Sequence, residues 1–174
     1  MTDESFEQFV HRSTPRLLRV AGPLCPQRAD AEDLVQDVLI RIARYWGKVS
    51  GASSPDAYVT RVLINEASRR ATASFRRREA IRDDGLSGTP DELAKQKFLQ
   101  IEDRADIRQL LRGLSADQRA ALVLYYVDDT PYDAIAALLG CREATARSHV
   151  RRGLAALRRN ETDLTSSTQR QEYQ

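Results

Sequence analysis

The chain has 174 residues, 41% of them hydrophobic, which is typical of one or two small globular domains. Its formal net charge is only +2, from 27 Lys and Arg against 25 Asp and Glu, so the overall charge does not indicate a nucleic-acid partner. Two cysteines exclude a disulfide framework, and the N-terminal segment lacks the pattern of a secretion signal. No apolar run approaches membrane-spanning length, so we expect a cytoplasmic protein without membrane insertion.

The first part of the chain carries two apolar patterns of helical period. Residues 4–22 show the first, interrupted by Pro15, which fits a helix start or a kink. Residues 31–49 show the second and most regular one, and Asp30 is expected to cap this helix. Its first turns are rich in acidic and amide side chains. These either complement the helix dipole or form a docking surface for a partner protein.

A third helix is predicted from residue 57 onward, capped by Ser54 or Asp56, and its character changes halfway. The first half is amphipathic, whereas the second half gathers arginines around one aromatic ring. Positive charge with an aromatic side chain can hold a nucleic-acid strand and stack on a base. A basic run that is merely solvated is the alternative. The cluster consists of Arg69, Arg70, Phe75, Arg76, Arg77, Arg78 and Arg82.

Composition divides the chain into two domains. Residues 1–82 form the first, and residues 83–104 then turn acidic and lose the helical period. This stretch contains two glycines and a proline, so we predict a flexible linker. Residues 105–160 form the second domain, and the polar tail of residues 161–174 is predicted to be disordered.

Within the second domain, Ser115 begins one predicted helix, and a helix-turn-helix follows it. Thr130 and Pro131 can open a short helix, because proline suits a first helical position. Gly140 can end that helix in the left-handed conformation, and a further helix starts near Glu143. This order of stops and starts is typical of the DNA-binding helix-turn-helix.

The last predicted helix has one apolar and one basic face. Apolar residues at three- and four-residue spacing predict the buried face, made of Ala146, Val150, Leu154 and Leu157. Between residues 141 and 159, six arginines stand against a single acid, Glu143. Arginine binds phosphates and donates bidentately to guanine, so this face favours a DNA contact. A solvated, arginine-rich surface helix is the alternative.

No constellation of residues indicates an enzyme. Neither His11 nor His149 has a neighbour at metal-ligand spacing, and the sequence contains no Gly-rich phosphate loop or nucleophile elbow. We therefore expect no catalytic residue, no metal and no cofactor.

Three motifs together resemble one family. They are AEDLVQDVLIRIARYW at 31–46, YVTRVLINEASRR at 58–70, and the stretch from LSADQRAALVLYYVDD to VRRGLAALRR at 114–159. The chain resembles a bacterial extracytoplasmic-function (ECF) sigma factor, a detachable subunit of RNA polymerase. The resemblance implies an all-α fold with two small helical domains, sigma-two-like and sigma-four-like. The partners that it implies are core RNA polymerase, promoter DNA and an anti-sigma factor.

The resemblance also implies roles for particular residues. The core polymerase-binding surface would comprise Asp33, Leu34, Gln36 and Asp37. The minus-ten promoter element would meet Asn65, Arg69, Arg70, Phe75, Arg76, Arg77 and Arg78, with a flipped base captured beside that helix. The minus-thirty-five element would be read in the major groove by Arg142, Thr145, Arg147, Ser148, Arg151 and Arg152. The chain departs from the family pattern at Arg69, where many members have Asp, and at Ala146, where many have a branched aliphatic residue.

Two other functions compete with this one. A stand-alone helix-turn-helix transcriptional regulator would need to dimerise, and we find no obvious dimerisation segment. It would also leave the AEDLVQD motif unexplained. A helical adaptor that sequesters a protein partner would use the acidic helix alone, and it would bind no DNA even in the presence of polymerase.

Overall fold

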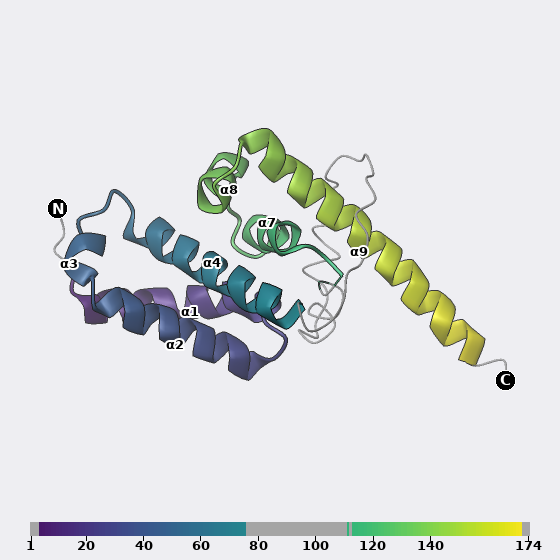
Figure 1. Cartoon of the computed structure of the whole chain (residues 1–174), viewed down its shortest axis with the longest axis horizontal. Helices are drawn as coiled ribbons and strands as arrows, with labels where there is room; N and C mark the ends of the chain where they lie inside the picture. Colours follow the sequence, from purple (N-terminus) through teal and green to yellow (C-terminus); the bar gives the residue numbers. More distant parts are fainter. Residues whose placement is uncertain (1–3, 76–110, 112, 172–174) are drawn as a thin grey trace.

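The structure is a computed structural model that describes residues 4–75, 111 and 113–171, and the regular structure in these residues is entirely helical. The predicted all-α fold is therefore confirmed. The first group of helices comprises α1 (Phe6–Leu24), α2 (Arg28–Ala43), α3 (Trp46–Val49) and α4 (Pro55–Phe75), and the second comprises α7 (Ala116–Tyr126), α8 (Tyr132–Leu139) and α9 (Glu143–Gln171) (Figure 1). The predicted linker at 83–104 and the arginines Arg76, Arg77, Arg78 and Arg82 lie outside the described residues.

The helices of the first group begin at polar caps. The Ser5 hydroxyl accepts a hydrogen bond from the Gln8 backbone N–H at 3.2 Å, and α1 then continues through Pro15 without ending. Ser54, one of the two expected caps of α4, accepts from the Ala57 N–H at 3.2 Å. The expected cap at Asp30 is wrong, because α2 begins earlier and Asp30 lies inside its first turn, where it accepts from the Gln27 N–H at 3.1 Å.

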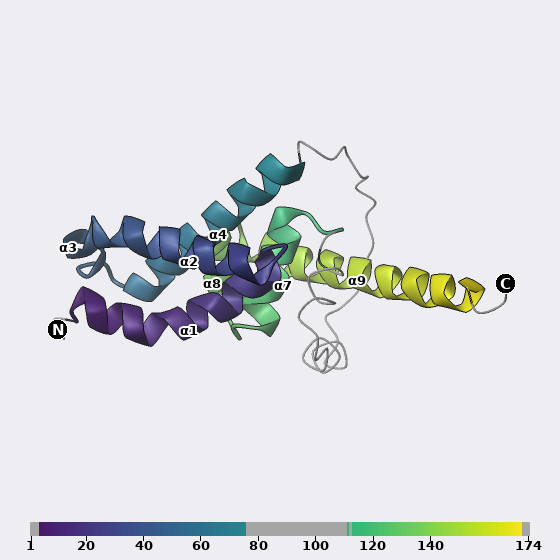
Figure 2. The same cartoon turned by 90° about the horizontal axis from the view of Figure 1, so that it is seen from below.

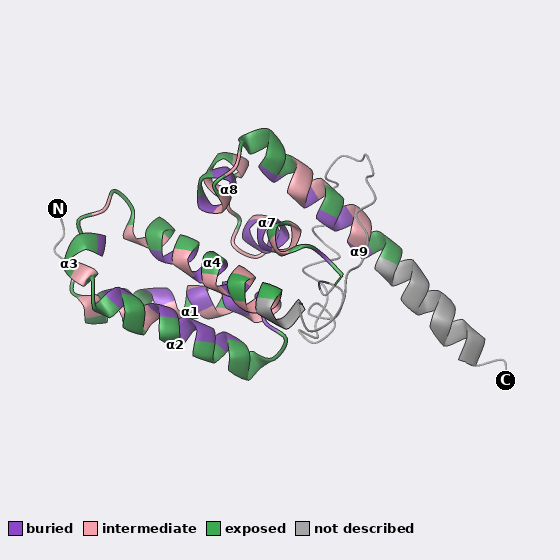
Figure 3. Ribbon diagram, viewed as in Figure 1, coloured by how far each residue is buried: buried purple, intermediate pink, exposed green. Residues whose placement is uncertain are grey.

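The predicted helix at 31–49 is divided in two. The α2 helix ends at Ala43, and the short α3 follows after Tyr45. This break turns the Trp46 ring onto Phe9, with ring centroids 4.9 Å apart, and leaves Tyr45 exposed. The core of the first domain lies between α1, α2 and α4, where buried residues line the facing sides of the helices (Figure 3).

The helix-turn-helix forms as predicted, except that Pro131 is the N-cap residue of α8 and not its first helical residue. Ser115 caps α7 by accepting from the Gln118 N–H at 3.3 Å. Gly140 ends α8 with φ of 68°, the left-handed conformation that glycine adopts at little cost. The α7 and α9 helices cross at Gly153, where an added Cβ would lie 2.7 Å from Leu122 Cδ1 and 3.4 Å from the Gln118 carbonyl oxygen. Any other residue here would force the buried Leu122 side chain to shift.

The α9 helix is longer than the sequence indicated. It is helical to Gln171 and thus enters the stretch 161–174, for which the disordered tail stays a prediction. Adding residues to an existing helix is far easier than nucleating a new one. Because no glycine or proline follows Gly153 in α9, nothing in the sequence stops its propagation.

The two groups of helices pack against each other. Both α1 and α4 contact α7, and α4 also contacts α8, so that α7 lies beside the first domain in both views (Figures 1 and 2). Arg16 of α1 crosses this boundary. Its Nε donates to Asp128 Oδ1 at 2.8 Å, its Nη2 donates to Asp128 Oδ2 at 2.5 Å, and its Nη1 donates to the Thr60 hydroxyl of α4 at 3.0 Å.

Asp128 is enclosed by this contact. Its side chain is 3% exposed, compared with 32% for Arg16, and its Oδ2 also accepts a hydrogen bond from the Thr130 hydroxyl at 3.1 Å.

Among the residues that the structure describes, no helix is both long and apolar enough to cross a membrane.

Candidate nucleic-acid interface

The first turns of α9 separate an apolar side from a polar side, as the sequence predicted. Ala146, Val150, Leu154 and Leu157 are buried against the rest of the second domain. The expected DNA-binding residues occupy the other side. Of these, Arg142, Thr145, Arg147 and Arg152 are exposed, whereas Ser148 and Arg151 are half-buried. The helix therefore presents a basic surface on a rigid, packed support.

Arg147 occupies a defined position on this surface although its side chain is 56% exposed. Its Nη2 donates to Glu143 Oε1 one turn earlier, at 2.6 Å. Its guanidinium carbon lies 4.5 Å from the centroid of the Tyr132 ring, which stacks in turn on Tyr125. Partial burial raises the pKa of the Tyr132 hydroxyl well above its ordinary value. The aromatic platform is therefore neutral and fixed under the guanidinium.

The α4 helix presents the expected minus-ten residues that the structure describes. Asn65 and Arg69 are exposed one turn apart, and Arg70 is half-buried. Glu66 lies between the arginines and accepts from Arg69 Nη2 at 2.6 Å and from Arg70 Nε at 3.2 Å. These hydrogen bonds, above all the one from Arg69, lower the pKa of Glu66 to about 2. The side chain of Phe75 and the whole of Arg76, Arg77 and Arg78 lie outside the described residues.

The acidic side of α2 is the expected polymerase surface. Asp33, Gln36 and Asp37 are exposed, but Leu34 is fully buried at 0% exposure. Leu34 is a core residue, so the expectation that it contacts a partner is corrected: it supports the exposed carboxylates from beneath. Ile40, which the sequence did not single out, is 51% exposed and continues the same side of the helix one turn after Gln36 and Asp37.

An ion pair joins α2 to α4. Arg70 Nη2 donates to Asp37 Oδ2 at 2.5 Å, so one of the expected polymerase contacts and one of the expected DNA contacts touch each other. The two surfaces are therefore adjacent, and Arg70 bridges Asp37 and Glu66.

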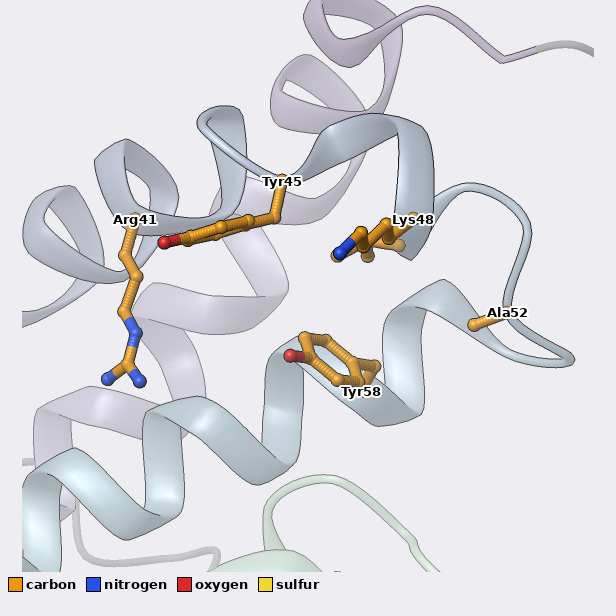
Figure 4. A pocket seen from close by; sticks show the side chains of 6 residues that line it. Arg41, Tyr45, Lys48, Ala52 and Tyr58 are labelled. Carbon is orange, nitrogen blue, oxygen red and sulfur yellow. The ribbon is translucent and has the colours of Figure 1, made fainter.

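A pocket of about 330 Å³ lies at the other end of α4, between its first turns and the α2–α3 corner. Figure 4 shows Arg41, Tyr45 and Lys48 on one side of the hollow and Tyr58 on the other. Two aromatic rings with two cations form a suitable site for an unpaired base and its phosphate. The sequence did not reveal this site, because it predicted one continuous helix over residues 31–49, which includes Tyr45. The break after α2 exposes Tyr45, and Tyr58 on α4 is exposed beside it.

Comparison with known proteins places these surfaces in a family. Residues 9–79 match the family model for sigma-70 region 2, and residues 104–157 match the model for sigma-70 region 4. The chain is 33% identical to the RNA polymerase sigma-E factor of Streptomyces avermitilis, over 88% of this chain and 83% of that protein. It is 26% identical to the ECF RNA polymerase sigma-E factor of Escherichia coli, over 88% of this chain and 85% of that protein.

A solved structure agrees with these matches. The sigma factor RpoE of Bartonella quintana, in complex with the anti-sigma factor NepR, superposes with a TM-score of 0.66 at 27% identity, over 88% of this chain and 94% of that one. A sigma factor is a non-enzymatic polymerase subunit, which agrees with the expectation that the chain is not an enzyme. The first group of helices corresponds to region 2 and the helix-turn-helix to region 4, so the chain belongs to the ECF family of RNA polymerase sigma factors and directs promoter-specific transcription initiation.

Proposed function

We propose that the exposed polar side of α9 reads the minus-thirty-five element, with Arg142, Thr145, Arg147, Ser148, Arg151 and Arg152 as its contacts. The observation that carries this proposal is the division of α9 into a fully buried apolar side and a basic side. A major groove is wide enough to admit a helix, and arginine pairs bidentately with guanine. Replacing Arg147 by Ala should weaken promoter binding by about 1–3 kcal/mol if it reads a base.

The α4 helix and the pocket at its start form the proposed minus-ten site. Asn65 faces solvent on the side that would meet DNA, and Tyr45 and Tyr58 line a hollow open to an unpaired base. Stacking on an aromatic ring typically contributes about 1–3 kcal/mol per base. A Tyr58→Ala substitution should therefore impair strand opening more than it impairs binding to duplex DNA. A normal permanganate footprint of the opened strand would contradict this assignment.

The exposed side of α2 is the proposed surface for core polymerase, through Asp33, Gln36 and Asp37 and with Ile40 as an apolar contact. Charge reversal by Asp33→Lys should weaken the complex with core polymerase in a binding assay. If the polymerase surface that meets α2 is positively charged, the new lysine would repel it. The matched control is Glu7→Lys on α1, another exposed acid in the same domain, which should leave the affinity unchanged. Equal affinity of Asp33→Lys and the wild-type chain would remove α2 from the interface.

The packed arrangement of the two domains bears on how the promoter is bound. The two promoter elements lie about 25 base pairs apart, which is roughly 85 Å of duplex at 3.4 Å per base pair. Domains joined by the contact of Arg16 with Asp128 cannot occupy both elements at once. Promoter binding therefore requires the domains to separate, and docking on polymerase would hold the separated domains in place.

We also propose an anti-sigma protein as a partner and the cytoplasm as the place of action. The similar Bartonella quintana structure is of a sigma factor in complex with the anti-sigma factor NepR, and the match extends over 88% of this chain, so it includes both domains. A protein that binds this chain in its packed form would keep the domains together. Its presence should abolish initiation by the chain in a purified system.

The function as a whole can be tested with purified components. The chain is added to sigma-free core polymerase with a library of promoter DNA, and initiated RNA is sequenced. Initiation at a shared two-part motif is the expected result. Selective DNA binding by the chain alone without initiation would instead indicate a stand-alone helix-turn-helix regulator.

A further inference from the structure

We infer that Tyr132 is a positioning residue for promoter recognition: it holds the Arg147 guanidinium in the orientation in which α9 reads a guanine. This inference rests on the proposed role of α9 at the minus-thirty-five element. It concerns the first residue of α8, a helix that is not itself expected to enter the groove.

Tyr132 is anchored from below. Its ring stacks on Tyr125, with centroids 4.7 Å apart and planes inclined by 17°. Tyr125 in turn meets the buried Tyr126 edge-on, with centroids 4.9 Å apart and planes at 89°. Three aromatic rings therefore connect the core of α7 to the surface. A ring held in this way loses little further freedom when it acts as a support.

Arg147 rests on the free face of that ring. A ring has two faces, and Tyr125 covers one of them. The guanidinium carbon of Arg147, 4.5 Å from the ring centroid, therefore lies over the opposite face. This is the geometry of a cation–π contact, in which the guanidinium plane can stack while its N–H groups point sideways.

Glu143 supplies the second fixed point. It accepts from Arg147 Nη2 at 2.6 Å, and both side chains are about half exposed. An exposed arginine ordinarily samples many rotamers and loses that freedom on binding. Held between a ring and a carboxylate, Arg147 meets DNA with its donors already oriented. Two N–H donors of a guanidinium held in one plane match the O6 and N7 acceptors of guanine. The major-groove edge of adenine offers them only one acceptor.

The consequence is a selectivity effect at one base pair. Without the Tyr132 ring, Arg147 keeps its charge and can still attract phosphates, but its orientation is no longer restricted. The preference for guanine at the position that Arg147 reads should then fall, while binding to the other positions is retained.

The test uses initiated RNA from a promoter library randomised over the minus-thirty-five element, with the full chain and core polymerase. Arg147→Ala first identifies the base pair that Arg147 reads. Tyr132→Leu should lower the enrichment of guanine at that same base pair by about tenfold and leave the other positions unchanged, because one good bidentate contact discriminates by that order. Tyr132→Phe keeps the ring and should resemble the wild-type chain.

Two further variants separate positioning from a loss of structure. Leu138→Ala removes a buried side chain from the same helix and keeps the Tyr132 ring, so it should lower initiation from all promoters equally. In an Arg147→Ala background, Tyr132→Leu should change the base preferences no further.

Three results would overturn the inference. One is an unchanged guanine preference in Tyr132→Leu, and another is a uniform loss at all positions as in Leu138→Ala. The third is a further change in the double variant. Failure of the underlying proposal would look different, because Arg147→Ala itself would then leave every base preference unaltered.

Discussion

The contact between Arg16 and Asp128 should control how tightly the two domains pack. In Arg16→Ala, the Asp128 carboxylate loses two charge-assisted hydrogen bonds, of 2.8 and 2.5 Å, and keeps the one from Thr130. Breaking a fully buried pair costs about 3–5 kcal/mol. Arg16 is 32% exposed, and Asp128 can regain water when the domains separate, so we expect about 2–3 kcal/mol. This corresponds to a shift of roughly 30- to 150-fold toward the separated state.

Fluorescence transfer between the domains measures this shift. A donor on the partly exposed Cys141 and an acceptor on an Ala43→Cys substitution report the distance through a urea titration. Cys25 does not compete for label near neutral pH, because burial raises the pKa of its thiol to about 11. Arg16→Ala should lose transfer at a lower urea concentration than the wild-type chain, with the helices still intact by circular dichroism.

The matched control is Arg12→Ala. Arg12 also lies on α1 and makes two ion pairs, but its partners Glu4 and Asp56 both belong to the first domain. This variant should lose transfer at the same urea concentration as the wild-type chain. If Arg16→Ala and Arg12→Ala lost fluorescence transfer at the same urea concentration, the contact of Arg16 with Asp128 would not hold the two domains together.

Three further outcomes follow from the structure. Gly153→Ala should lower the free energy of unfolding by about 1–3 kcal/mol, measured by thermal denaturation, because the new Cβ would overlap Leu122. Gly22→Ala is the control, since nothing lies within 4 Å of a Cβ at that position. Equal destabilisation by the two substitutions would contradict the argument. Because the pKa of Glu66 is lowered from 4.5 to about 2, its ionised carboxylate stabilises the fold above pH 4.5, and this stabilisation is lost as the pH falls toward about 2. Glu66→Gln should therefore lose less stability over that pH range in acid titrations followed by circular dichroism. Because burial raises the pKa of Cys25 to about 11, the stability of the fold should fall as the pH rises from 9 to about 11 and stay reduced above that. Alkylation of Cys25, followed by mass spectrometry, should keep accelerating to about pH 11, whereas a plateau near pH 9 would show that the thiol is not buried.

Local signals in the sequence were enough to predict the helix-turn-helix. Ser115 caps a helix through its own hydroxyl, and Gly140 ends one through its own backbone freedom, so each acts within a few residues of its position. The apolar side of α9 followed from helical period alone, and every residue predicted for it is buried. Such features depend on the chain near each residue and hardly on the rest of the fold.

Contacts between distant residues were not predictable in this way. Arg16 and Asp128 are 112 positions apart, and Arg16 lies outside the three motifs, so no spacing brings the two residues together. The pairing of Tyr132 with Arg147 has the same origin, because it requires the turn between α8 and α9 to be formed first. Leu34 shows the converse error: a residue inside a functional motif was taken for a contact, although its apolar side chain is needed in the core.

The packing of α7 against Gly153 of α9 limits which residues position 153 can hold. Leu122 rests directly on the backbone of Gly153, and every other amino acid would bring a Cβ to within 2.7 Å of it. All nineteen replacements therefore begin with the same overlap, whatever their polarity or size beyond the Cβ. Leu122 can relieve this overlap only by moving within a fully buried core, so any substitution at position 153 must change the packing beneath the recognition helix.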